Sequence, residues 1–195
     1  MATKELDRIL QLKITLLGSK PPIWRRIQIP ANISFHQLHN YIQFAMGWEN
    51  CHLYGFRVMP TGKKAVETSY YGNVGILIDD ESVKSPKSAK VADYLTLAKQ
   101  EILYCYDFGD DWMHKIVLEE ILAPASGKKY PLCLDGKRAC PPEDCGGVYA
   151  YQEALEAISD PEHPDYEDVI EWFDEDFDPE DFDPKDVVFS ELRMR

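Results

Sequence analysis

The fold is decided by residues 9–59, which read ILQLKITLLGSKPPIWRRIQIPANISFHQLHNYIQFAMGWENCHLYGFRVM. Apolar side chains alternate along residues 9–17, as expected of a strand with one buried face. Gly18 and two prolines follow and predict a turn, because glycine frees the backbone and proline forbids continued pairing. A second strand is predicted at residues 23–29, with Trp24 and Arg26 on one face and the isoleucines on the other. The stretch therefore begins with a β-hairpin.

A helix is predicted after this hairpin. Ser34 can cap the free amides at its start, and Gln37 can complete a capping box. Apolar residues then recur at helical spacing as far as Gly47, a residue typical of helix ends. A further strand is predicted at residues 53–59. Hairpin, helix and strand in this order indicate a β-grasp-like ββαβ start.

Strands and helices both follow in the rest of the chain. Residues 60–90 are rich in turn formers, with short strands expected near residues 70–71 and 76–78, and residues 91–97 suggest a short helix. Residues 101–107 and 113–122 flank an FGDD turn and predict a second hairpin. Helices are predicted at residues 148–158 and 166–173, the second with Val169, Ile170 and Phe173 inward. The fold class is therefore α+β, with a mixed, mainly antiparallel sheet and C-terminal helices.

The acidic residues are concentrated near the C-terminus. Residues 159–186 contain 14 of the 34 Asp and Glu residues and one Lys, so they carry the net charge of −13 of the whole chain. We therefore divide the chain into a single α+β domain, residues 1–158, and an acidic, aromatic-containing C-terminal segment, residues 159–195, packed on the domain or appended to it. Such a segment repels nucleic acid and anionic lipid and attracts a basic protein surface or a cation.

The acidic segment contains a tandem repeat, EDFDP, at residues 175–179 and 180–184. Four aromatic residues are spaced among its carboxylates: Trp172, Phe173, Phe177 and Phe182. A solvated tail is one interpretation; rings that pack on the domain, or that anchor a partner with a basic rim, are the others. An EF-hand is excluded, because Pro179 stands where that loop needs Gly and Lys185 where it needs Glu.

The location of the protein is predicted from what the sequence lacks. No apolar run approaches the roughly 18 residues that cross a bilayer, and the first residues have no signal-peptide core. We therefore expect a cytoplasmic protein that does not enter the membrane. The five cysteines are accordingly not expected to form disulfides.

Two motifs are candidates for a polar pocket: YDFGDDWMH at residues 106–114 and CPPEDCGG at residues 140–147. Their carboxylates and imidazoles could converge as ligands or as general acid and base. The simpler interpretation of the first motif is a hairpin turn with exposed aspartates. The candidate pocket residues are His52, Asp107, Asp110, His114, Glu143 and Asp144.

The second motif and the chain before it contain three thiols, of Cys133, Cys140 and Cys145. With His52 or His114 as a fourth ligand, they could hold a structural zinc ion. Their spacing is wider than that of usual zinc knuckles, so the alternative is three ordinary buried cysteines.

Many of these residues together resemble the family of plasmid pRi ORF-3-like proteins, insertion-sequence passengers often labelled TnpR resolvase. The resemblance runs over roughly residues 10–190, and it includes the acidic stretch DPEHPDYEDVIEWF and the FDP repeats. The matching positions are Trp24–Arg26, Leu38, His39, Ile42, Gln43, Met46–Trp48, His52, Phe56, Tyr106–Asp110, Trp112, His114, Cys133, Gly136, Ala139–Asp144, Gly146 and Gly147. The resemblance implies an association with mobile elements and no particular activity.

Two functions of different classes follow. The first is a non-catalytic binding or adaptor module with an acidic surface for a basic partner. The alternative is a metal-dependent enzyme or small-ligand pocket formed by the two motifs. Resolvase activity is not expected, because the chain lacks both a nucleophilic serine among arginines and a basic helix-turn-helix. Direct binding to nucleic acid is not expected of so acidic a chain.

Overall fold

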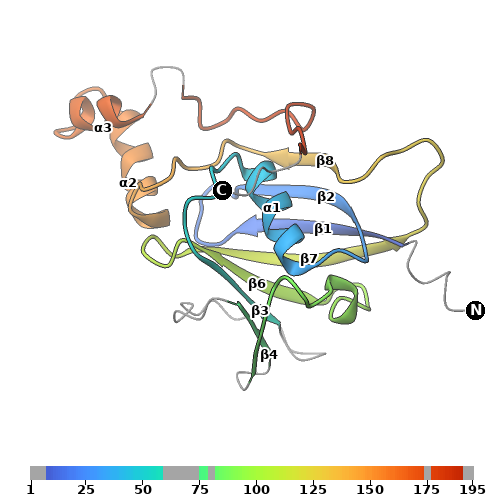
Figure 1. The fold of residues 1–195 in the computed structure, drawn as a ribbon. Coiled ribbons are helices and arrows are strands. Elements are labelled where there is room, and N and C mark those ends of the chain that lie inside the picture. The colour runs from blue at the N-terminus through green and yellow to red at the C-terminus, as the bar shows by residue number, and fades with distance from the viewer. Residues whose placement is uncertain (1–7, 59–74, 79–81, 174–176, 191–195) are drawn as a thin grey trace, which may run out of the picture.

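The computed structural model describes residues 8–58, 75–78, 82–173 and 177–190. Its centre is an eight-stranded sheet in the order β5-β4-β3-β6-β7-β1-β2-β8. Helix α1 lies across one face of the sheet, and α2 and α3 lie beyond one end (Figure 1). The elements are β1 (Ile9–Leu16), β2 (Trp24–Pro30), α1 (Phe35–Met46), β3 (Tyr54–Val58), β4 (Gly75–Ile78), β5 (Ser82–Lys84), the 3₁₀ turn η2 (Val91–Asp93), β6 (Glu101–Tyr106), β7 (Trp112–Leu122), β8 (Leu132–Lys137), α2 (Gly147–Ile158) and α3 (Tyr166–Trp172).

The predicted α+β class and the mixed, mainly antiparallel sheet are confirmed. Strands β1 and β2 pair antiparallel, as the alternation of apolar residues predicted. The apolar face of β1 is almost fully buried, because Leu10, Leu12, Ile14 and Leu16 all point into the core. The one parallel pairing among the described strands joins β3 to β4.

Helix α1 begins and ends where the sequence indicated. The Ser34 hydroxyl accepts the Gln37 amide at 3.2 Å, and the Gln37 side chain accepts the Ser34 amide at 2.9 Å, which forms the capping box. Gly47 ends the helix in the left-handed conformation, with φ 90°. The buried face of the helix includes His39, whose ring stacks on Tyr54 at a centroid distance of 3.5 Å.

The order ββαβ is present, but the third strand does not lie beside the first hairpin. Strand β3 pairs with β4 and β6, and β6 and β7 stand between it and β1. The second predicted hairpin is β6–β7, which pairs from Glu101 with Val117 to Tyr106 with Trp112. This arrangement brings the end of α1 and the β6–β7 turn to the same end of the sheet.

The region after β3 contains little regular structure among its described residues. Residues 76–78 belong to β4, as expected, and the expected strand at residues 70–71 lies outside the described residues. The short helix predicted at residues 91–97 is a single 3₁₀ turn, Val91–Asp93. Within the described residues, no helix combines the length and apolar character needed to cross a membrane.

The acidic segment folds back on the domain. Phe173 is buried beside Tyr151 of α2, and Phe177 stacks on Phe173 at 4.6 Å between ring centroids. Residues 177–190, here called the C-terminal strap, then run beside β8 (Figure 1). Phe182 lies over the guanidinium of Arg25 at 3.8 Å, and Phe189 packs edge-on against Tyr41.

The described parts of the EDFDP repeats form two equivalent turns. The side chain of Asp178 accepts the Glu180 amide at 2.8 Å, and that of Asp183 accepts the Lys185 amide at 2.9 Å. Such Asx turns are what an Asp-Pro dipeptide favours. In α3, Ile170 is 41% exposed, so the prediction that it points inward is wrong. Phe173, the residue that directly follows the helix, is buried as predicted.

Candidate functional site

Three loops meet at one end of the sheet: the link between α1 and β3, the β6–β7 turn, and the loop between β8 and α2. The carboxylate of Asp110 accepts the amide of Gly146 at 2.9 Å and so joins the second loop to the third. Gly147 has φ +83°, and a Cβ there would stand 2.4 Å from the Asp110 carbonyl oxygen. This close approach requires glycine. The Trp48 indole also donates to the carbonyl of Pro141 at 3.0 Å.

His52, from the first loop, stands between carboxylates of the other two. Its Nδ1 is 3.7 Å from Asp107 Oδ2, and its Nε2 is 3.0 Å from Asp144 Oδ1. The Nε2 atom is buried without a properly oriented hydrogen bond to any described residue. Both aspartates have left-handed backbones, with φ 53° at Asp107 and 58° at Asp144, a conformation that Asp tolerates better than most residues.

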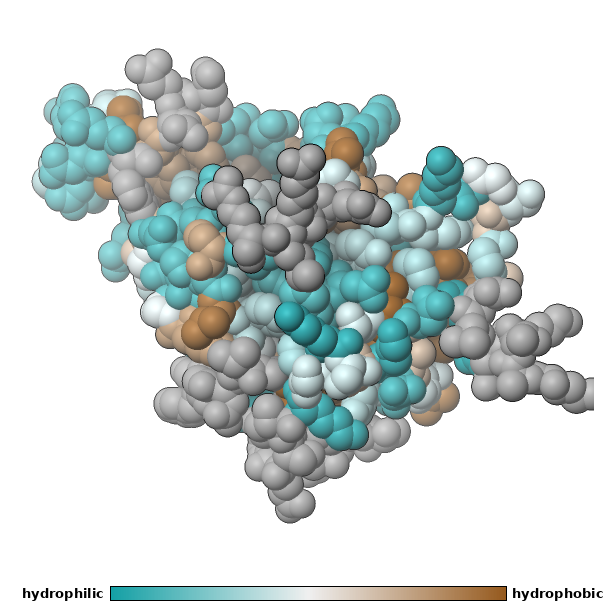
Figure 2. All heavy atoms as spheres, in the orientation of Figure 1, coloured by the Kyte–Doolittle hydropathy of each residue, from teal (hydrophilic) through white to brown (hydrophobic). Residues whose placement is uncertain are grey.

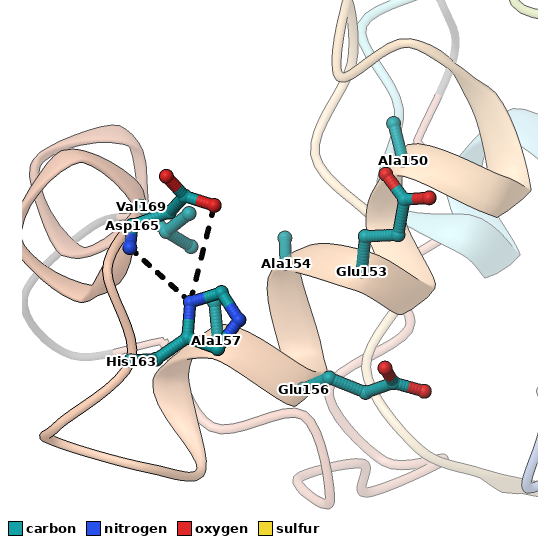
Figure 3. Close-up of a pocket in the computed structure, with 8 residues that line it drawn as sticks. All are labelled: Ala150, Glu153, Ala154, Glu156, Ala157, His163, Asp165 and Val169. Atoms are coloured by element: carbon teal, nitrogen blue, oxygen red, sulfur yellow. Dashed lines mark hydrogen bonds and ion pairs between the residues drawn. The ribbon is translucent and has the colours of Figure 1, made fainter.

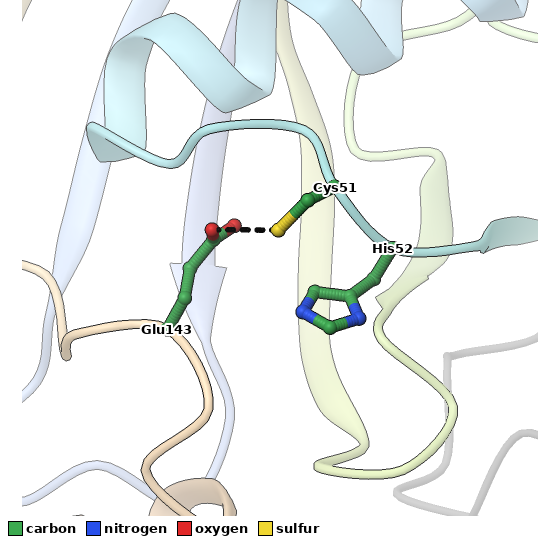
Figure 4. Close-up of side chains that lie close together, drawn as sticks. All are labelled: Cys51, His52 and Glu143. Atoms are coloured by element: carbon green, nitrogen blue, oxygen red, sulfur yellow. Dashed lines mark hydrogen bonds between the residues drawn. The ribbon is translucent and has the colours of Figure 1, made fainter.

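Cys51 and Glu143 lie next to this histidine (Figure 4). The Cys51 thiol donates to Glu143 at 3.0 Å, and the Tyr106 hydroxyl donates to the other oxygen of the same carboxylate. Tyr106 also accepts the backbone amides of Cys51 at 3.0 Å and His52 at 3.3 Å. Burial, followed by the hydrogen bond to Glu143, raises the pKa of Cys51 above its ordinary value.

These residues form two overlapping sets of potential metal ligands. One contains Cys51, His52 and Glu143, and the other His52, Asp107 and Asp144. Within each set, the ligand atoms all lie within 4.8 Å of one another. We call these five residues the loop cluster. Four of them were candidates from the sequence. Cys51 was not a candidate, because a single cysteine outside a CxxC pattern gives no indication in the sequence of which residues lie beside it in the folded chain.

Asp110 and His114, the other two candidates, have different positions. Asp110 fixes the loops through the amide of Gly146. His114 is fully buried on β7 beneath the ring of Trp48, at 5.3 Å between centroids, and its Nδ1 is 2.9 Å from the Trp112 carbonyl. Desolvation lowers the pKa of His114 to about 3, so the ring is neutral at ordinary pH. His114 therefore packs in the core against Trp48 and Tyr104 and is not part of the loop cluster.

The structure does not bring Cys133, Cys140 and Cys145 together with a histidine as one ligand set among the described residues. Cys133 and Cys140 instead lie near the buried guanidinium of Arg25, and Cys145 is buried in the core. Burial raises the pKa of Cys145 to about 12. All five cysteines of the chain are free thiols.

The sequence model of the plasmid pRiA4b ORF-3-like protein family matches residues 8–186. The chain belongs to this family. The match includes all three loops that form the cluster and most of the acidic segment, and the resemblance inferred from the motifs is thereby confirmed.

Two relatives of this ORF-3-like chain carry no assigned activity in their descriptions. The chain is 37% identical over 168 residues to the uncharacterized protein y4hQ of Sinorhizobium fredii, and the alignment covers 84% of this chain and 80% of the relative. A crystal structure of MM3350, a protein of unknown function from Methanosarcina mazei Go1, has a TM-score of 0.80 and 45% identity, covering 93% of this chain and 98% of the other. The comparisons therefore support the fold and the family of unknown function.

The acidic end of this ORF-3-like chain has a groove of its own, between α2 and α3 (Figure 3). The groove measures about 390 Å³ and is lined by Ala150, Glu153, Ala154, Glu156, Ala157, His163, Asp165 and Val169. Its carboxylates come from both sides, and the lining contains no Lys or Arg. Hydrophilic side chains also dominate the surface around α3, at the upper left of Figure 2.

Most carboxylates of the acidic segment have no basic partner among the described residues. The ion pairs of that segment are Glu180 with Arg138, at 2.7 Å, and Asp165 with His163, at 3.9 Å, the latter only when the imidazole is protonated. The rings of Phe173, Phe177, Phe182 and Phe189 pack against the domain, whereas Asp178, Asp181 and Asp183 are exposed. The strap is therefore attached by its rings, the Glu180–Arg138 pair and the hydrogen bond from the Ala139 amide to the Pro179 carbonyl, and it presents most of its carboxylates to solvent.

Proposed function

We propose that the chain is a non-catalytic binding module, associated with mobile elements, that docks a basic segment of a partner protein at its acidic C-terminal end. The observation that carries the proposal is the groove between α2 and α3. Its alanines leave room for a long side chain, and Glu153, Glu156 and Asp165 line the groove with negative charge that attracts a Lys or Arg. The family's plasmid-derived description supports the association with mobile elements.

The arrangement of the strap supports the same proposal. A segment folded back only for stability would not need so many exposed, unpaired carboxylates, because their mutual repulsion opposes the compact state. Among the described residues, the attachment is made by the rings of Phe173, Phe177, Phe182 and Phe189, by the hydrogen bond from the Ala139 amide to the Pro179 carbonyl, and by one ion pair, Glu180 with Arg138. The remaining charge is available for a basic partner, whose approach it accelerates at low ionic strength.

Binding to an oligolysine peptide tests the proposal. Replacing both groove glutamates (Glu153→Gln with Glu156→Gln) should weaken binding about 2- to 30-fold, at about 0.2–1 kcal/mol for each exposed pair. The matched control removes the same charge elsewhere, at the exposed residues Asp93 and Glu120 (Asp93→Asn with Glu120→Gln). If both variants weaken binding equally, the attraction is a property of the net charge and the groove is not the docking site.

A further inference from the structure

We propose that the loop cluster binds one divalent metal ion of the zinc class. Cys51, His52 and Glu143 would be its ligands, a water molecule would take the fourth position, and Asp107 would orient the imidazole. This site is separate from the acidic groove, so it goes beyond the binding function proposed above.

The first argument is the chemical composition of the cluster. A thiol, an imidazole and carboxylates are the three ligand types that zinc takes in proteins, and a site that is partly open to solvent leaves room for a water or a substrate atom. Cys51 is exposed, and the side chain of His52 is 28% exposed. No Lys or Arg forms an ion pair with Glu143, Asp144 or Asp107 within the described ranges. The negative charge of these carboxylates is therefore available to a cation.

The second argument is distance. Tetrahedral coordination with bonds of about 2.0–2.3 Å separates neighbouring ligand atoms by about 3.3–3.8 Å. The thiol and carboxylate of Cys51 and Glu143 are 3.0 Å apart, as are His52 Nε2 and Asp144 Oδ1. Both distances are somewhat shorter than such an edge, and the ligand atoms of Cys51, His52 and Glu143 all lie within 4.8 Å of one another. These three side chains can therefore face one ion after rotation, whereas Asp144 belongs to the second set, which shares only His52 with the first.

The third argument is the state of the His52 ring. Its Nε2 is buried and has no properly oriented hydrogen-bond partner, which is unusual for a nitrogen inside a protein. In Figure 4, one ring nitrogen faces Cys51 and Glu143 while the other points away from them. Asp107, beside Nδ1 at 3.7 Å, stands where a carboxylate orients a metal-binding histidine in many sites. A metal ion at Nε2 would give that nitrogen a partner in place of the misaligned Asp144 carboxylate, 3.0 Å away.

The surrounding structure holds these groups in place. The Tyr106 hydroxyl contacts Glu143 and the backbone amides of Cys51 and His52, and so connects three parts of the site. Hydrogen bonds that hold metal ligands in place in this way usually change metal affinity 10- to 100-fold.

Titration of the reduced, chelator-treated full chain with Co²⁺ tests the proposal. We expect one equivalent to bind with a thiolate-to-cobalt charge-transfer band, and Zn²⁺ to displace it. Cys51→Ser should abolish the band, whereas the control Cys133→Ser, a thiol outside the cluster, should keep it. Asp107→Asn should lower the affinity about 10- to 100-fold. Absence of stoichiometric binding, or a band that survives in Cys51→Ser, would overturn the proposal.

Thermal unfolding with Zn²⁺ provides a second readout. At a concentration of about 100 times Kd, zinc should raise the Tm of the natural chain by about 5–10 °C. His52→Gln should lose this shift, and the control His163→Gln, at the acidic end, should keep it. An equal shift in His52→Gln and in the natural chain would show that zinc binds elsewhere. Cys51→Ser, at an exposed position, supplies the spectroscopic answer even if His52→Gln does not fold.

Discussion

The contact between Phe182 and Gly136 allows the position of the C-terminal strap to be tested by a double-mutant cycle. A Cβ on Gly136 would stand 2.3 Å from Cε1 of the Phe182 ring, far inside van der Waals contact. Gly136→Ala must therefore displace the ring or shift β8, and overpacking of this kind costs about 1–3 kcal/mol of the free energy of unfolding.

The second variant of the cycle removes the ring. Phe182→Ala should lower the free energy of unfolding by about 1–3 kcal/mol, since a half-buried ring and its contact with Arg25 are both lost. In this background Gly136→Ala has no ring to meet. It should then be neutral or stabilise the strand by about 0.5–1 kcal/mol, because Ala has less backbone freedom than Gly in the unfolded chain.

Urea denaturation of the four proteins measures the coupling. We expect the cost of Gly136→Ala to fall by about 1–3 kcal/mol between the two backgrounds, at a constant m-value. Additivity within about 0.5 kcal/mol would refute the placement of Phe182 over Gly136, and with it the strap. A loss of stability that is common to both backgrounds does not affect the result, because the coupling is the difference between the cost of Gly136→Ala with Phe182 present and its cost with the ring removed.

Three further predictions concern stability. Ser34→Ala should cost about 1 kcal/mol through the lost capping box, and Ser34→Thr should keep most of it in the same denaturation assay. Burial lowers the pKa of both His114 and His39 to about 3. Because these folded-state pKa values are depressed, the stability that the neutral rings contribute is complete above the unfolded pKa near 6.5 and is lost as the pH falls toward 3. The free energy of unfolding, measured over this pH range, should therefore decline steeply, and His163→Gln should leave that decline unchanged. The hydrogen bond from Arg26 lowers the pKa of Glu119. Glu119→Gln should therefore lower the free energy of unfolding by at most about 1 kcal/mol near pH 7, and should not change it once the pH is below the folded-state pKa. An equal effect at both pH values would contradict the pairing.

The local elements could be predicted because their signals are local. The capping box at Ser34 and the alternation along β1 each depend on residues a few positions apart, and both appear as expected. The order of the strands could not be predicted. The placement of β6 and β7 between β3 and β1 depends on contacts across about 100 residues, which periodicity does not encode.

The candidate site shows the same division. His52, Asp107, Glu143 and Asp144 were selected as polar residues in motifs rich in turn formers, and the loops that carry them do converge. His114 was a candidate for the same reason, but the alternation of buried and exposed residues along β7 places it on the core face, so it is buried. Cys51 and the support from Tyr106 could be found only from the folded chain, since their partner Glu143 is distant in sequence.

The C-terminal strap lies beside β8, the last strand of the sheet in the described structure. A terminal strand offers free amide and carbonyl groups to a strand of another molecule. The strap places two prolines and several aspartates along that border, where they discourage such pairing. Recombinant versions of the chain that stop before residue 177 should therefore retain a folded body but assemble edge to edge.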